Sequence, residues 1–171
     1  LDREMPEGPT SLLVLPYFEM TGPPGFVADA AGAIVGLKTG TTRGEILKAI
    51  LECETLYFVE SMNALKELGA DSSEFMATGG GARSDAWLQI KADIFGVPLI
   101  RPRISEGSVL GAAMLAGIAT GVYATPAEAV EQFVHADRVF EPDEGRHARY
   151  REKYEVYREL LPSLHPLLRK L

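Results

Sequence analysis

Apolar and polar residues alternate along the chain in blocks that predict alternating strands and helices. Short apolar runs bounded by glycine or proline are typical of strands, and apolar residues spaced three or four positions apart are typical of helices. The predicted strands cover residues 11–17, 33–38, 74–80 and 97–102. The predicted helices cover residues 43–68, 85–95, 105–119 and 126–134, and helical spacing returns in the tail 143–171, where Pro162 and Pro166 are expected to interrupt it.

This order of elements predicts an α/β fold. The strand–helix–strand unit over residues 74–102 favours parallel pairing of its two strands through a right-handed crossover. Residues 19–32, rich in glycine, proline and alanine, predict a loop.

The predicted helix 43–68 is the longest element. Thr42 is suited to cap its start and Gly69 to end it. Lys48 and Glu52, one turn apart, are expected to pair outside its apolar stripe. That stripe is predicted to consist of Leu47, Leu51, Phe58, Met62 and Leu65, with Ile50 and Leu68 at its edge.

Two glycine-containing turns stand between a predicted strand and a predicted helix. Gly79, Gly80 and Gly81 precede one helix, and Gly40 and Gly44 flank the start of another. Ligands of open α/β sheets bind at the carboxyl ends of the strands, where such turns lie. There the first amides of the following helix are free, and glycine lets a nucleotide approach the backbone. The alternative is a pair of tight turns in a structural or interaction module that binds nothing.

A dinucleotide site is a second alternative. Gly79, Gly81 and Ser84 nearly reproduce the spacing of the dinucleotide-binding fingerprint, with serine in place of the last glycine. Arg101 and Arg103 follow the next strand, where an arginine that binds the phosphate of NADP could stand. However, this fingerprint normally lies in the first strand–helix unit of its fold. Here two other strands and a long helix precede it.

Composition narrows the class of protein. The formal net charge of −7 argues against a nucleic-acid partner, which favours basic surfaces. Cys53, the one cysteine, excludes an internal disulfide and is expected to be a small core residue. No apolar run is long enough to span a membrane, and no signal peptide is evident, which predicts a cytoplasmic protein. Because the sequence begins with Leu1 rather than methionine, we expect a fragment of a longer chain.

Residues 32–52, GAIVGLKTGTTRGEILKAILE, resemble the C-terminal signature of the FGGY family of carbohydrate kinases. Residues 77–99 are similar to that family's adenosine-binding segment, and residues 106–123 to the segment that follows it. Ser84, where glycerol kinases usually carry asparagine, makes the chain most similar to xylulose-kinase-like members. The matching signature positions are Gly32, Ile34, Gly36, Leu37, Glu45, Ile46, Ala49, Ile50, Leu51 and Glu52.

The resemblance implies a domain of the actin/Hsp70/sugar-kinase type (ribonuclease H-like), incomplete on its N-terminal side. Residues 1–171 would form the C-terminal, nucleotide-binding domain of a kinase that uses ATP and Mg²⁺ to phosphorylate a hydroxyl of a sugar, a pentulose such as xylulose. The resemblance implies that Gly40 approaches the phosphates of ATP or ADP. It also implies that Gly80 and Gly81 pass the adenosine, that Ser84 hydrogen-bonds it, and that Gly44 takes a nucleotide-contacting position whose side chain is missing here. Gly79, the first glycine of the same turn, is predicted as a nucleotide-binding residue with them.

The same resemblance places the sugar site, the metal ligands and the catalytic aspartate in an N-terminal half that these residues do not include. We therefore expect no catalytic or metal-binding residue in this segment and no activity from the segment alone. The missing strands are expected to leave an open sheet edge that invites a homodimer. Asp93 is expected at a polar edge or in a structural pair, and Glu106 to complement a helix dipole.

Overall fold

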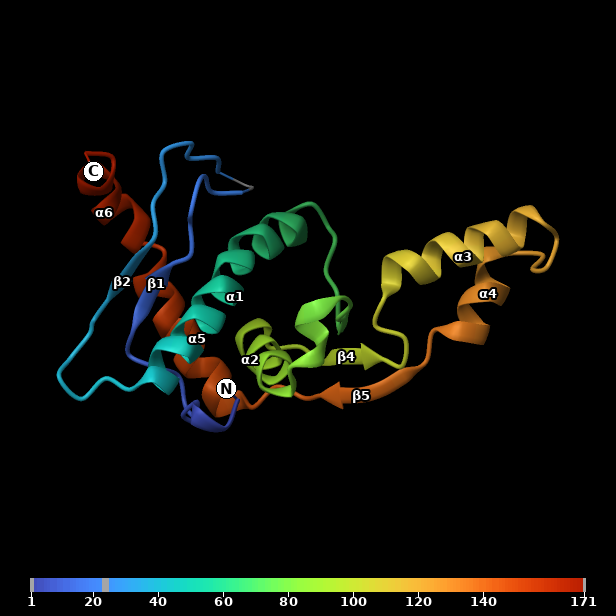
Figure 1. Cartoon of the computed structure of the whole chain (residues 1–171), viewed down its shortest axis with the longest axis horizontal. Coiled ribbons are helices and arrows are strands. Elements are labelled where there is room, and N and C mark those ends of the chain that lie inside the picture. Colours follow the sequence, from blue (N-terminus) through green and yellow to red (C-terminus); the bar gives the residue numbers. More distant parts are fainter. Residues whose placement is uncertain (1, 23–24, 171) are drawn as a thin grey trace.

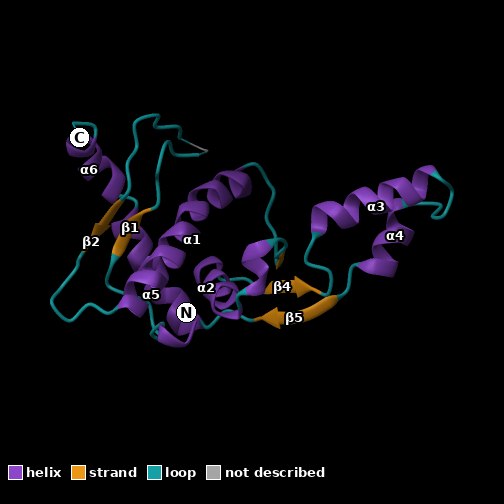
Figure 2. Ribbon diagram, in the orientation of Figure 1, coloured by secondary structure: helices purple, strands orange, loops and turns teal. Residues whose placement is uncertain are grey.

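The computed structural model describes residues 2–22 and 25–170 and confirms a mixed helix–sheet fold (Figure 1, Figure 2). The strands are β1 (Leu13–Leu15), β2 (Ala33–Val35), β3 (Phe75–Met76), β4 (Leu99–Pro102) and β5 (Ala136–Phe140). The α-helices are α1 (Arg43–Glu67), α2 (Asp85–Phe95), α3 (Gly107–Ala119), α4 (Pro126–Phe133), α5 (Glu144–Tyr157) and α6 (Leu160–Leu168). Two 3-10 turns, η1 (Asp2–Glu4) and η2 (Gly80–Arg83), complete the described elements.

The strands form two separate sheets. β1 and β2 make an antiparallel pair, whereas β3, β4 and β5 make a second sheet in that order. β3 and β4 run parallel and are joined through α2, which confirms the predicted strand–helix–strand unit. β5 pairs antiparallel with β4 and was not predicted from the sequence. The predicted interruption of the tail is confirmed ahead of Pro162, between the end of α5 at Tyr157 and the start of α6 at Leu160, and Pro162 lies in the first turn of α6, where proline is tolerated. The interruption predicted at Pro166 is wrong, because α6 continues through it to Leu168.

The helix α1 organises the larger part of the molecule, with β1, α2 and α5 packed around it (Figure 1). Thr42 and Glu45 form a capping box at its start, and Gly69 follows its end with a φ of 84°. Both predicted boundaries are therefore confirmed. The buried face of α1 carries small or polar residues beside its apolar ones: Gly44, Lys48, Ala49, Glu52, Cys53, Thr55 and Leu56.

The prediction for the core-facing stripe of α1 is wrong for several of its residues. Phe58 and Leu65 are 47% and 53% exposed, and Leu68 is 83% exposed. Apolar spacing marks a face that suits burial, but this chain covers a neighbouring face instead. Lys48 and Glu52, predicted to lie outside the stripe, are buried.

Lys48 and Glu52 each bind other partners than one another. The Lys48 ammonium donates to the backbone carbonyl oxygens of Pro6 and Glu7 at 2.6 and 2.9 Å. Burial lowers the pKa of this lysine, and Glu52 partly opposes the shift. The predicted pair across one turn is thus replaced by contacts that fix the N-terminal segment against α1.

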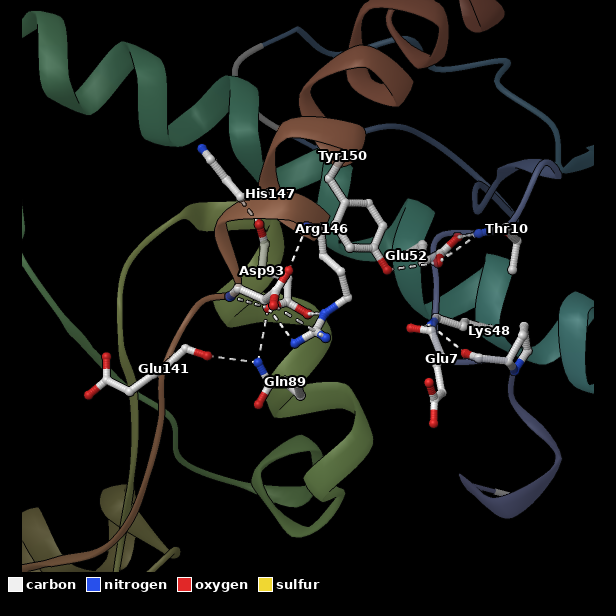
Figure 3. Close-up of polar contacts among 12 residues, drawn as sticks. Glu7, Thr10, Lys48, Glu52, Gln89, Asp93, Glu141, Arg146, His147 and Tyr150 are labelled. Carbon is white, nitrogen blue, oxygen red and sulfur yellow. Dashed lines mark hydrogen bonds and ion pairs between the residues drawn. The ribbon is translucent and has the colours of Figure 1, made fainter.

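Glu52 is the centre of a buried polar network (Figure 3). Its carboxylate accepts hydrogen bonds from the Thr10 hydroxyl at 2.6 Å and the Tyr150 hydroxyl at 2.8 Å, and pairs with the Lys153 ammonium at 2.5 Å. Burial, followed by the nearby Glu52 carboxylate, raises the pKa of Tyr150, which stays protonated as a donor. The network joins the N-terminal segment, α1 and α5.

A second network surrounds Asp93 on α2 (Figure 3). This carboxylate pairs with the Arg146 guanidinium at 2.6 Å and accepts from the Gln89 amide and the Asp143 backbone N–H, both at 2.9 Å. Asp93 therefore belongs to a structural ion pair, which is one of the two roles predicted for it from the sequence.

Cys53 confirms its predicted place in the core. It is fully buried, and its thiol lies 3.2 Å from the backbone nitrogen of Val14. Burial raises its pKa to about 11, so the thiolate is scarce at neutral pH.

None of the helices in the described ranges 2–22 and 25–170 has the length and apolar character needed to cross a bilayer.

Apolar surface stays open around β3. Among the described residues this strand pairs only with β4, so its other edge has no partner. The helix α3 contains no buried residue, although its sequence GSVLGAAMLAGIA has no charged side chain. It extends with α4 away from the sheet, at the opposite end of the molecule from α6 (Figure 1).

Candidate functional site

The turn after β3 places its glycines directly before α2. Gly79 has a φ of 78°, a conformation that favours glycine, and its N–H donates to the Ser105 carbonyl at 2.7 Å. Gly80 begins the short turn η2, which ends at Arg83. Ser84 then caps α2 by accepting from the Trp87 backbone N–H at 3.2 Å. The first free amides of α2 therefore open next to this turn.

Packing within the chain explains two of the six predicted site residues. A Cβ on Gly81 would lie 2.9 Å from the Trp87 ring, whose indole N–H donates to Thr55. A Cβ on Gly44 would lie 1.7 Å from the carbonyl oxygen of Glu4. Both positions require glycine whether or not a ligand is bound.

Gly40 and Gly80 have no such internal reason. A Cβ built on either residue meets nothing within 4 Å, and neither has the positive φ found at Gly79. Space in front of these two residues is open on the side where a side chain would stand. A ligand that approaches the backbone closely is a physical reason for glycine at such positions.

The 3-10 turn η1 touches both glycine turns. The Ser84 hydroxyl donates to the Asp2 carboxylate at 3.2 Å, while Glu4 supplies the carbonyl that covers Gly44. The Glu4 carboxylate also lies 3.6 Å from the Arg43 guanidinium at the start of α1. The starts of α1 and α2 are therefore on the same side of the molecule, separated by η1.

Sequence reasoning missed Asp2 and Glu4. Their contacts join residues more than 35 positions apart, and an acidic residue near a chain start carries no signal for such contacts. The Ser84 hydroxyl, predicted to hydrogen-bond a nucleotide, thus donates to the Asp2 carboxylate while it accepts from the Trp87 backbone N–H, each at 3.2 Å.

Ion pairs fix the elements around the turn at Gly79–Gly81. Arg83 pairs with Glu106 at 3.0 Å, which links η2 to the start of α3, and Glu106 makes no side-chain cap. Arg101 pairs with Asp85 at 2.5 Å and Asp137 at 3.0 Å. These hydrogen bonds, Asp85 first, raise the pKa of Arg101. Arg101 is thus already bound to two carboxylates, of which Asp85 also pairs with Arg138, and this engagement disfavours its use for the phosphate of NADP.

The part of the chain that the structure describes contains no group of three or more histidine, cysteine, aspartate or glutamate side chains placed to hold a metal ion. Among the predicted site residues the groups that can meet a ligand are backbone amides and the Ser84 hydroxyl, which suit phosphate and nucleoside groups rather than a cation. These residues fit a nucleotide, and they offer no site for Mg²⁺ by themselves.

Comparison with known proteins places this geometry in a family. Residues 2–120 match the C-terminal domain of the FGGY family of carbohydrate kinases. The chain is 34% identical over 150 residues to a xylulose kinase of Staphylococcus epidermidis, covering 88% of this chain and 30% of that protein. It is 38% identical over 152 residues to a glycerol kinase of Bordetella parapertussis, covering 85% of this chain and 30% of that protein.

A solved structure shows the same fold. The crystal structure of a xylulose kinase from Rhodospirillum rubrum superposes with a TM-score of 0.80 and 31% identity, covering 98% of this chain and 33% of that one. The chain therefore spans about 30% of the length of the curated relatives it matches.

Proposed function

The chain belongs to the FGGY family of carbohydrate kinases, and from that premise we propose that it is the nucleotide-binding part of an ATP-dependent sugar kinase. Residues 1–171 would form the C-terminal domain. The complete protein would transfer a phosphoryl group from ATP to a hydroxyl of a sugar. ATP supplies that group when bound, and its Mg²⁺ would be held by residues outside this segment.

The observation that carries this proposal is the openness at Gly40 and Gly80. Each residue lies in a turn before a helix, and neither needs to be glycine for packing or for a positive φ. Gly40 would let phosphate groups approach the backbone, and Gly80, with Gly79 and Gly81 on either side, would let the adenosine do so.

The remaining predicted residues would orient the nucleotide. The Ser84 hydroxyl, already polarised by Asp2, would hydrogen-bond the adenosine. Gly44 would act indirectly, because its missing side chain lets η1 lie against α1. The start of α1, which follows Gly40, would direct the positive end of its helix dipole toward the bound phosphates. In phosphoryl transfer such positioning and charge neutralisation are the main contributions of a protein.

The open surfaces support an arrangement in which further chain completes this domain. This further chain would cover the edge of β3 that pairs with no described strand and the exposed apolar residues Phe58 and Leu65 of α1. In the isolated segment the same surfaces would favour a homodimer.

We also propose that the protein is cytoplasmic, because ATP and the sugars that such a kinase phosphorylates are available in the cytoplasm.

We propose a pentulose such as xylulose as the substrate, on the similarity to xylulose kinases. The relatives also include glycerol kinases, so the test is a direct comparison in the complete protein. With ATP and Mg²⁺, kcat/KM for D-xylulose is expected to exceed that for glycerol by about a hundredfold or more, because a site built for one pattern of hydroxyl groups leaves polar groups unpaired with another. The isolated segment is expected to phosphorylate neither. Equal use of both, or preference for glycerol, would overturn the pentulose assignment.

A further inference from the structure

A hollow of about 450 Å³ lies between the C-terminal half of α1, the end of α2 and the helix α5. Leu56 and Lys66 of α1 line it. Because a helix rises about 1.5 Å per residue, these residues lie about 18 and 33 Å along α1 from Gly44. The hollow is therefore separate from the glycine turns at the starts of α1 and α2. Its volume is in the range of small-molecule sites, roughly 300–1,000 Å³.

The floor of the hollow is apolar. Leu56 and Ile94 line it and are themselves part of the buried core, while Val59 and Phe95 are partly buried and pack against that core. An apolar ligand would displace water from these side chains. Because removing apolar surface from water is favourable, the hollow favours binding of an aromatic ring or a branched chain.

Basic side chains stand at the rim. Arg151 of α5 is exposed, and Lys66 pairs with Asp71 at 3.3 Å, with both side chains exposed to solvent. Such surface pairs contribute little and exchange readily for a stronger acceptor. The acidic Glu155 also lines the hollow, but Arg158 lies 3.6 Å from its carboxylate. In a chain of net charge −7, this rim is a place where an anion meets local positive charge.

His147 gives the wall a fixed polar atom. Its Nδ1 lies 2.9 Å from the backbone carbonyl oxygen of Asp93, so Nδ1 carries the hydrogen and donates (Figure 3). The neutral ring then has Nε2 as an acceptor. The ring packs over Gly96, where a Cβ would lie 2.6 Å from Cε1, and this contact holds its orientation.

We propose that this hollow binds a small apolar carboxylate, with its ring or branched chain on the floor and its carboxylate between Arg151 and Lys66. A hydroxyl group on such a ligand would donate to Nε2 of His147. The site is distinct from the proposed nucleotide site, and its occupancy does not depend on kinase activity.

The test is a titration of the isotopically labelled chain with 4-hydroxybenzoate, followed by amide chemical shifts. We expect saturable shifts at Phe95, His147 and Arg151. The neutral analogue 4-hydroxybenzyl alcohol and the charged but small acetate are expected to bind at least about tenfold more weakly, because each lacks one of the two interactions.

Two matched variants separate the hollow from general surface charge. Arg151→Glu is expected to weaken binding of 4-hydroxybenzoate at least about tenfold, whereas Arg149→Glu, on the same helix but lining a different depression, is expected to change it less than about twofold. Circular dichroism of both variants verifies that the fold is retained. The proposal is overturned if the two variants weaken binding equally, if the alcohol binds as well as the acid, or if the shifts gather at Gly80.

Discussion

Replacement of Lys153 by methionine is expected to lower the free energy of unfolding by about 3–5 kcal/mol. Lys153 supplies the positive charge for Glu52, whose side chain is fully buried, and the two groups lie 2.5 Å apart. The variant would leave a carboxylate in the core with only the hydrogen bonds from Thr10 and Tyr150. Denaturant unfolding followed by circular dichroism measures the loss.

The control is a double variant, Glu52→Met with Lys153→Met. Removing both charges avoids the unpaired carboxylate, so the double variant is expected to be more stable than Lys153→Met alone. A loss below about 1 kcal/mol for Lys153→Met would be the value of a solvent-exposed pair and would contradict the burial of this network.

Gly80→Ala is expected to lower the affinity for ADP by about tenfold or more while leaving the melting temperature without ligand unchanged. The new Cβ has no neighbour within 4 Å, so the fold has room for it, whereas a nucleotide resting on the backbone does not. Isothermal titration calorimetry gives the affinity. Gly40→Ala should act in the same way through the phosphates.

Gly111→Ala is the matched control for that change. It also meets nothing within 4 Å, but it lies in α3, outside both glycine turns. Its affinity for ADP should equal that of the unchanged chain. Gly81→Ala should differ from both, because contact with Trp87 at 2.9 Å costs about 1–3 kcal/mol of stability as well. Normal ADP binding by Gly80→Ala would remove the reason given for glycine there.

Local sequence signals predicted the elements that position the site. The strand–helix–strand unit around Gly79–Gly81, the capping residue Thr42 and the stop at Gly69 all depend on neighbouring residues. Backbone hydrogen bonds and glycine conformations are short-range effects, so they can be read from a single sequence.

Long-range packing could not be predicted in the same way. The spacing of Phe58 and Leu65 marks an apolar face of α1, but not whether this chain covers it. Glu52 matches the last position of the family signature, yet its burial depends on Thr10 and Lys153, which are 42 and 101 positions away. The strand β5 forms beside β4 although its own burial pattern leaves only Phe140 buried.

The candidate site shows the same division. Six residues were predicted from the sequence, and the structure gives internal packing reasons for Gly44 and Gly81. Contacts of η1 with Ser84 and Gly44 link the starts of the two helices through η1, and no sequence pattern indicated them. Contact of these residues with a nucleotide stays a prediction.

Titration of the isotopically labelled chain with ADP, with amide chemical shifts as the readout, tests the central claim most directly. The claim is that the turns at Gly40 and Gly80 belong to one nucleotide site. Signals of Gly40, Gly80 and Ser84 should then shift together, with one dissociation constant, and NADPH should leave them unmoved. Shifts at only one turn, or a response of Arg101 and Arg103 to NADPH instead, would contradict it.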